Sequence, residues 1–287
     1  MTDVIEVAGL DFRYSRGKPP AVRGMEFAVG SGEIMGFLGP SGAGKSTTQK
    51  ILTGLLGGYR GVAALWGRSP RQWGDELYQH IGVSFELPNH YRKLTALENL
   101  RFFASLHDRP TRNPLELLEA VGLADAGGTR VGEFSKGMQM RLGFVRALLH
   151  DPGLLFLDEP TSGLDPRNAR VVKDLVLEHK ARGTTVFLST HDMATADELC
   201  DRVAFVVDGH IAVLGSPTEL KIARSERLVR AAYRDGNGLR EVDFDFDELA
   251  DDPEFHRMLR EERVETLHSR EADLDDVFLE TTGRSLR

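Results

Sequence analysis

Eight consecutive residues have the types and the order of a loop that binds phosphate. They follow the pattern G-x-x-x-x-G-K-S and are, in order, Gly39, Pro40, Ser41, Gly42, Ala43, Gly44, Lys45 and Ser46. Glycines let the backbone turn closely enough for successive N–H groups to point at phosphate oxygens. Lys45 would reach β- and γ-phosphates, and the Ser46 hydroxyl would be a ligand of Mg²⁺. Thr47 is a further candidate for phosphate contact.

The chain on either side of this loop favours the elements that such a loop requires. The apolar run 34–38 predicts a strand before the loop, and residues 46–55 predict a helix after it. A helix that begins at the loop adds partial positive charge where the phosphates would lie. A glycine-rich turn without a ligand is the alternative, but it does not account for strand, loop and helix together.

A second apolar run, residues 154–157, ends in the adjacent carboxylates Asp158 and Glu159. Asp158 would hold the Mg²⁺ shell, directly or through water. Glu159 would orient and polarise an attacking water as general base. Adjacent acids at a strand end are common, so the pair alone is a weak indication. Together with the phosphate-binding loop it indicates hydrolysis of a nucleoside triphosphate.

Residues 134–139, Phe-Ser-Lys-Gly-Met-Gln, resemble the signature sequence of the nucleotide-binding subunits of ABC transporters. The resemblance to that family covers about residues 4–217. The signature departs from its commonest form at three positions but keeps Ser135 and Gly137. In the family these two residues present a hydroxyl and a backbone N–H to the γ-phosphate bound by the opposite subunit. An ordinary serine-capped helix would fit the local pattern but would not explain the strand and carboxylates that follow.

Other positions take their roles from the same resemblance. Residues 161–165 resemble the D-loop, which lies across the dimer interface in the family. His191, directly after the predicted strand 185–189, matches the switch histidine that contacts the γ-phosphate and water. Tyr14 matches the aromatic residue that stacks on adenine, because a π-face can hold a base without reading its edge. Packing alone would also suit Tyr14.

Glu86 departs from the family pattern. The family has a glutamine after the strand that leads into the helical lobe, whereas the stretch 81–86 ends here in a glutamate. A carboxylate oxygen can still ligate Mg²⁺ or water. It also adds negative charge beside the γ-phosphate. We therefore expect Glu86 to keep the contact with the metal and to alter the catalytic properties of the site.

The resemblance implies an α/β fold. The core would be a P-loop NTPase of the ABC ATPase type with an amino-terminal antiparallel β region, an inserted helical subdomain and a small α+β carboxy-terminal tail. Short strands are expected at 4–7, 11–14 and 24–29, and a hairpin around Asp208-Gly209. The expected domains are an ABC ATP-binding domain at 1–217, with its helical subdomain at about 87–150, and an acidic accessory subdomain at 218–287.

Composition excludes several classes of protein. One cysteine among 287 residues excludes an internal disulfide, and no run approaches the about 18 apolar residues of a membrane span. The formal net charge is −8, and residues 240–287 carry sixteen acidic against seven basic side chains. The remainder is nearly neutral and shows no basic stripe. We therefore expect no nucleic-acid partner.

The resemblance also implies cofactors and partners. The cofactors would be ATP and Mg²⁺. Since the signature serves a nucleotide held by another copy, a second ATP-binding subunit is required, and a homodimer is expected. In the family the helical lobe and the adjoining Glu86 loop dock a separate integral-membrane permease. The chain would then lie at the cytoplasmic face of the cell membrane, attached through that partner.

The direction of transport and the rival functions follow from the same features. The form of the signature, Glu86 and the ending 274–283 resemble subunits of drug- and antibiotic-export systems of the ABC-2 type, which favours export of a drug-like molecule, another small molecule or a lipid. A soluble ABC ATPase that acts on protein or nucleic acid without transport is the alternative. A P-loop kinase or GTPase would leave the signature and His191 unexplained. The tail could regulate, dimerise or serve as a simple acidic cap.

Overall fold

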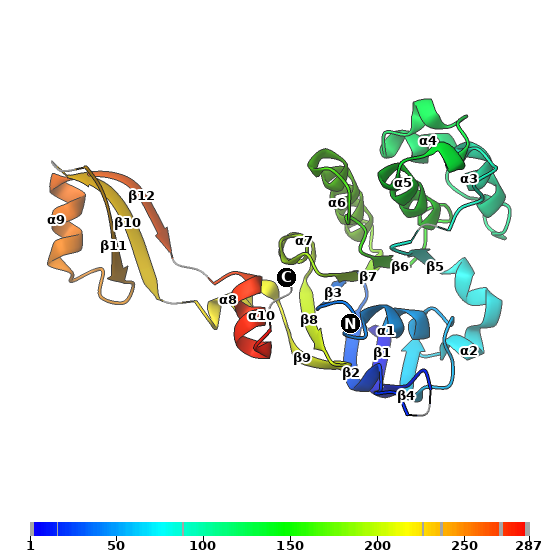
Figure 1. Cartoon of the computed structure of the whole chain (residues 1–287), viewed down its shortest axis with the longest axis horizontal. Coiled ribbons are helices and arrows are strands. Elements are labelled where there is room, and N and C mark those ends of the chain that lie inside the picture. The colour runs from blue at the N-terminus through cyan, green and yellow to red at the C-terminus, as the bar shows by residue number, and fades with distance from the viewer. Residues whose placement is uncertain are drawn as a thin grey trace. The chain divides into compact units, whose positions relative to one another are not determined.

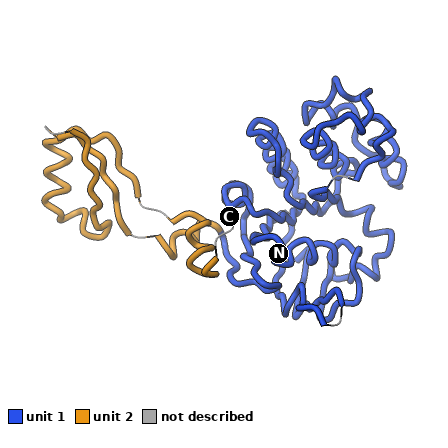
Figure 2. Tube along the Cα trace, viewed as in Figure 1, with its two compact units in different colours: residues 1–216, 286–287 blue, residues 217–285 orange. Residues whose placement is uncertain are grey.

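A computed structural model describes residues 3–15, 17–87, 89–225, 227–235, 238–269 and 272–284. The chain forms two compact units (Figure 2). The first contains residues 1–216 with 286–287, and the second contains residues 217–285. Within the described ranges, no helix has both the length and the apolar composition needed to cross a bilayer.

A six-stranded sheet forms the centre of the first unit (Figure 1). Its strands, in spatial order, are β5 (Ile81–Ser84), β6 (Leu154–Asp158), β7 (Thr185–Thr190), β3 (Ile34–Leu38), β8 (Arg202–Val207) and β9 (His210–Gly215). Strands β5 to β8 are parallel, and β8 pairs antiparallel with β9. All residues of β3, β6 and β7 are buried, which explains why these strands have continuous apolar runs. The predicted core strands and the hairpin are confirmed.

A smaller antiparallel sheet has the order β2-β1-β4, with bounds Val22–Gly30, Asp3–Phe12 and Arg60–Leu65. The prediction of separate strands at 4–7 and 11–14 is wrong, because β1 is one strand whose register shifts twice beyond Val7. Gly9, at φ 55°, lies in the first of these irregularities. The strand β4 was not predicted.

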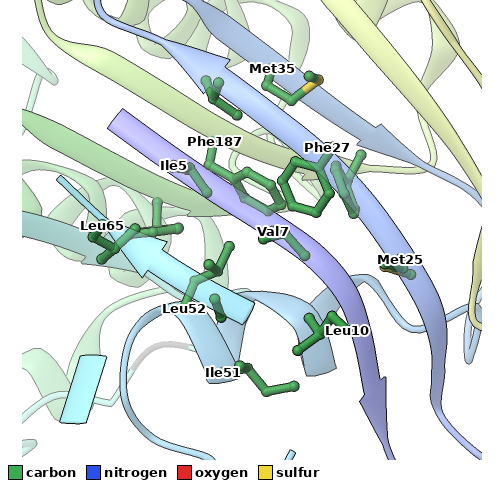
Figure 3. Packing of buried hydrophobic residues seen from close by; sticks show 14 of the residues in the cluster. Ile5, Val7, Leu10, Met25, Phe27, Met35, Ile51, Leu52, Leu65 and Phe187 are labelled. Atoms are coloured by element: carbon green, nitrogen blue, oxygen red, sulfur yellow. The ribbon is translucent and has the colours of Figure 1, made fainter. Parts of the chain in front are cut away.

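Aromatic side chains from both sheets form the middle of the main core. Phe37 of β3 lies 4.7 Å from Phe27 of β2 and 4.6 Å from Phe187 of β7, measured between ring centroids. Figure 3 shows Phe27 and Phe187 beside Ile5 and Val7 of β1. This core fixes the ends of β3, β6 and β7, where the candidate site lies.

Most helices of the first unit begin after a polar capping residue. Their bounds are α1 Lys45–Leu52, α2 Pro70–Trp73, α3 Ala96–Ala104, α4 Pro114–Ala120, α5 Lys136–Ala147, α6 Pro166–Ala181 and α7 Met193–Leu199, with 3₁₀ turns at Gly74–Gln79 (η1), Ala124–Ala126 and Val131–Glu133. Thr95 and Glu98 form a capping box before α3, in which they exchange hydrogen bonds of 2.8 and 3.2 Å. Helix α1 ends three residues earlier than predicted, before Gly54 at φ 77°.

An aromatic corner lies between β4 and η1. It consists of Trp66, Trp73 and His80, with Trp66 and Trp73 packed edge to face at 5.8 Å and Trp73 5.2 Å from His80. The Arg68 guanidinium covers the Trp73 ring at 3.9 Å. Trp66 and Trp73 are the only two tryptophans in the sequence.

The second unit contains α8 (Pro217–Ile222), β10 (Leu228–Asp235), β11 (Gly238–Asp245), α9 (Pro253–Glu261), β12 (Arg263–Ser269) and α10 (Leu274–Thr282). Its antiparallel sheet has the order β11-β10-β12 and shares a small core with α9, formed by Ala231, Tyr233, Phe244 and Met258. Apolar and acidic residues alternate along the second half of β11, and Phe246, which continues this alternation in the sequence, lies beyond the strand and is 49% exposed. Helix α10 ends at Gly283, which has a φ of 66° in the left-handed region.

Candidate active site

The phosphate-binding loop connects the end of β3 to the start of α1, as predicted. Two of its glycines are required by space. A Cβ added to Gly39 would lie 2.1 Å from the Val206 carbonyl oxygen, and one added to Gly44 would lie 2.5 Å from the Ala21 carbonyl oxygen. Both residues also have positive φ, 157° and 111°. The neighbouring backbone therefore holds the loop in its turned form.

Lys45 points back into the loop and is 8% exposed. Its Nζ donates to the carbonyl oxygens of Gly39 at 2.5 Å and Pro40 at 3.2 Å. Burial lowers the pKa of the Lys45 ammonium, and the nearby carboxylates Glu159, Asp158 and Glu86 oppose that shift. The Lys45 side chain therefore lies within the loop that would surround the phosphates.

A pocket of about 380 Å³ lies over this loop. Its lining joins residues far apart in the sequence: Tyr14, Ala21, Ser41, Gly42, Ala43, Gly44, Lys45, Ser46, Thr47, Glu86, Asp158 and Glu159. Ala21 was not predicted to belong to the site, because it carries no polar side chain to indicate a role. We call this cavity the nucleotide pocket.

Asp158 is positioned by hydroxyl groups. Its Oδ1 accepts a hydrogen bond from Ser46 at 3.4 Å and a short one from Ser189, on the neighbouring strand β7. Asp158 is 8% exposed and Ser189 is fully buried. Sequence reasoning missed Ser189, although a serine closing an otherwise apolar strand was a usable signal.

Glu159 has an unusual backbone and two side-chain partners. Its φ of 50° lies in the left-handed region, which is uncommon for a residue with a side chain. His191 Nδ1 lies 2.7 Å from Glu159 Oε1, and the Thr190 hydroxyl donates to Oε2 at 3.1 Å. The Glu159 side chain is 10% exposed and that of His191 is 58% exposed. The carboxylate is therefore fixed at both oxygens beside the pocket.

Tyr14 presents its ring at the edge of the pocket. The side chain is 57% exposed, and its hydroxyl lies 3.1 Å from Thr47 Oγ1. Phe12 packs edge to face against the ring at 5.0 Å. The ring is held from one side and accessible from another, which suits stacking on a base.

Ser135 and Gly137 lie at the start of α5. Ser135 caps the helix by accepting a hydrogen bond from the Met138 backbone N–H at 3.2 Å. A Cβ added to Gly137 would lie 3.4 Å from the Leu164 side chain, within the predicted D-loop. Among the described residues, neither of these two lines the nucleotide pocket of its own chain.

The oxygen donors at the pocket fit a hard cation that also binds phosphate. Across the described positions, no group of three or more His, Cys, Asp or Glu side chains could hold a metal ion. Ser46 and Asp158 offer a hydroxyl and a carboxylate at the phosphate loop. Mg²⁺ is commonly bound in this way, through one or two carboxylates plus the phosphates of the substrate.

Two family models match the chain. One described as ABC transporter matches residues 22–162, and one described as fluoroquinolone efflux ABC transporter C-terminal domain matches residues 227–271. The first match includes the phosphate-binding loop, the signature and both carboxylates. The second lies within the second compact unit.

Several curated relatives resemble most of the chain. A fluoroquinolones export ATP-binding protein of Mycobacterium tuberculosis is 67% identical, over 99% of this chain and 95% of that protein. The Nod factor export ATP-binding protein I of Burkholderia orbicola is 33% identical, over 99% of this chain and 100% of that protein. The bacitracin transport ATP-binding protein of Bacillus licheniformis is 38% identical, over 74% and 69% of the two chains.

Solved structures share the fold. An ATP-binding subunit of an ABC transporter has a TM-score of 0.69 at 29% identity, covering 76% of this chain and 91% of that one. A dimeric ATP-binding cassette in a post-hydrolysis state, bound to ADP and Pi, has a TM-score of 0.68 at 25% identity, covering 74% and 98%. The predicted fold class is confirmed by these likenesses.

Proposed function

Because this chain belongs to the ATP-binding subunits of ABC transporters, we propose that it drives export of a fluoroquinolone-like antibiotic by hydrolysing ATP. The observation that carries this proposal is the 67% identity, over 99% of the chain, to a fluoroquinolones export ATP-binding protein. The match of residues 227–271 to a fluoroquinolone efflux C-terminal domain supports the same cargo class. No observation favours the soluble, non-transporting alternative.

The pocket supports a specific division of roles in hydrolysis. Glu159 accepts the proton of the attacking water. Its contacts with Thr190 and His191 hold the carboxylate in the orientation that this transfer requires. His191, held beside Glu159, would contact the γ-phosphate, and Lys45 would exchange the loop carbonyls for β- and γ-phosphate oxygens. Tyr14 stacks on the adenine.

Metal-binding residues complete this proposal. Ser46 and Asp158 would hold Mg²⁺, and Glu86 adds a third oxygen donor at the pocket. When bound, the metal neutralises charge that develops on the transferred phosphoryl group. The residues Gly39 to Thr47 supply the backbone cradle around the phosphates.

The position of the signature supports action as a homodimer. Ser135 and Gly137 are at a helix start outside the pocket of their own chain. The Ser135 hydroxyl, whose oxygen accepts from the Met138 N–H, would donate its hydrogen to a nucleotide held by a second copy. Two copies arranged head to tail would enclose two ATP molecules. Hydrolysis would then reopen the pair.

An apolar groove in the first unit supports docking of a membrane subunit. It has a volume of about 600 Å³, and its lining includes Leu55, Tyr78, Val83, Phe85, Phe103 and Leu106. Arg146 lies over the Phe103 ring at 4.5 Å and adds positive charge to this lining. A partner helix with an apolar face and a carboxylate would complement the groove. Such docking would place the chain at the cytoplasmic face of the membrane.

Drug accumulation in cells tests the function. The chain would be expressed with the multi-span protein that co-purifies with it, in cells that lack both, and the uptake of a fluorescent fluoroquinolone would be followed. We expect lower accumulation than with Glu159→Gln, which keeps the assembly but blocks turnover. Equal accumulation in the two strains would contradict the proposal that a fluoroquinolone is exported. Recovery of soluble partners alone in the purification would favour the non-transporting ATPase.

A further inference from the structure

Three buried polar side chains lie together beneath the phosphate-binding loop. Gln49 of α1 is 1% exposed, Ser189 of β7 is fully buried, and Asp158 of β6 is 8% exposed. Ser189 Oγ makes a short contact with Asp158 Oδ1 and lies 3.3 Å from Gln49 Oε1. Polar groups buried among apolar strands destabilise the fold unless they are hydrogen-bonded, so the direction of each bond matters.

The hydroxyl of Ser189 has one hydrogen to donate. The shorter contact goes to a carboxylate, which is the stronger acceptor, so the hydrogen belongs there. Gln49 Oε1 would then face only lone pairs of Ser189. At the same time, Gln49 Nε2 is buried and has no hydrogen-bond partner among the described atoms. Rotating the amide by half a turn exchanges its two terminal atoms, and the two orientations have the same shape. The Nε2 group then donates to Ser189 Oγ, and Oε1 takes the position in which a buried N–H group had no acceptor.

We infer that Gln49, Ser189 and Asp158 form a directed hydrogen-bond relay. The Gln49 amide donates to the Ser189 hydroxyl, and that hydroxyl donates to the Asp158 carboxylate. The relay ties α1, which begins with Lys45 and Ser46, to the carboxylate assigned to the Mg²⁺ shell, so it rests on the proposed function. Gln49 and Ser189 are positioning residues that hold Asp158 in one orientation without touching phosphate or metal.

Nucleotide binding with and without Mg²⁺ tests the relay. Calorimetry would compare Ser189→Ala and Gln49→Leu with the unaltered chain, first in EDTA and then across a Mg²⁺ titration. We expect unchanged ATP affinity in EDTA and an increase of about 10-fold in the Mg²⁺ concentration needed for tight binding. Thr53→Val is the matched control, because Thr53 is equally buried at the end of α1 and donates to a backbone carbonyl. It should leave both measurements unchanged.

A double variant tests the link between the two positions. If Gln49 acts through Ser189, Gln49→Leu should add nothing to the effect of Ser189→Ala. Effects that add in full would overturn the relay. Asp158→Asn provides the reference for the metal role. If it abolishes the Mg²⁺ response while both relay variants respond normally, the relay is wrong and the ATPase assignment stands.

Side-chain amide exchange tests the relay without any nucleotide. In the ¹⁵N-labelled protein, the Gln49 side-chain NH₂ should exchange slowly with solvent because it donates within the core. Ser189→Ala should speed that exchange, and thermal melting would show that the variant is folded. Rapid exchange in the unaltered protein would overturn the relay while leaving the proposed function untouched.

Discussion

At the scale of single residues, hydrogen bonds hold the charged side chains of the candidate site in fixed orientations. Glu159 is fixed at both oxygens, and its backbone has a φ of 50° that few residues with side chains adopt. Preorganised groups of this kind need little rearrangement when charge develops during a reaction.

Glu159→Gln tests the general base. The amide keeps the size of the side chain but cannot take a proton, so hydrolysis should fall by about 100-fold or more, the range for loss of a general base. ATP binding should persist, and the dimer should accumulate because it no longer reopens. Phosphate release and light scattering would measure the two effects. A variant that stays monomeric with normal turnover would remove Glu159 from this role.

Glu86→Gln tests the departure from the family pattern. Glu86 is exposed at the nucleotide pocket and acts electrostatically on Lys45. Removing its charge should change the rate of ATP turnover and the Mg²⁺ concentration that supports it. Steady-state kinetics at several Mg²⁺ concentrations would detect the change. Unaltered turnover and metal dependence would contradict the predicted tuning role.

At the scale of elements, two histidines connect the segment after α5 to the segment after α3. His150 stacks on His107 at 3.9 Å, and its Nε2 lies 3.1 Å from the Ile81 carbonyl oxygen. Burial lowers the pKa of His150 from 6.5 to about 4, with His107 contributing in the same direction. The folded protein therefore keeps this ring neutral at pH values where the unfolded chain protonates it.

Stability should fall as pH decreases from about 6.5 towards 4, because the unfolded chain binds the extra proton in that window. His90, whose pKa is also lowered to about 4, acts in the same direction. In His150→Gln, which retains an amide donor, the decline in melting temperature across this window should be shallower. Melting curves at pH 7 provide the baseline. The same slope in both proteins would contradict the assignment.

Elements with a continuous local pattern could be predicted from the sequence. Strands β3, β6 and β7 are buried on both faces, so their apolar runs identify them. The capping box before α3 lies within four consecutive residues and is equally local. The contacts of Asp158 could not be predicted. Asp158 and Ser189 are far apart in the sequence and meet only because β6 and β7 are neighbours in the sheet. The single strand β1 was missed because its bulges interrupt the alternation.

At the scale of the whole molecule, function depends on surfaces that one chain leaves open. The exposed leucine Leu106 lines the apolar groove, whereas Leu115, on α4, does not appear in its lining among the described residues. Their exposed fractions are similar, 55% and 49%. Substitution at either position should therefore affect folding equally little.

Leu106→Asp should abolish co-purification with the membrane subunit, because a charge would be buried against the apolar face of its partner. ATP binding should be unchanged, since the groove is separate from the nucleotide pocket. Leu115→Asp is the control and should keep the complex. A pull-down from membranes, quantified by mass spectrometry, measures the difference. Intact assembly with Leu106→Asp would show that the groove does not dock the partner.

The aromatic corner gives the chain an optical label of its own. Both tryptophans lie there, and neither is among the described residues that line the nucleotide pocket. Adenine bound against Tyr14 would therefore not quench their emission by contact. A change in intrinsic fluorescence on adding ATP would instead report a movement that reaches β4 and η1. Stopped-flow fluorescence of the unlabelled protein would therefore measure how fast ATP binding at the nucleotide pocket changes the surroundings of the two tryptophans.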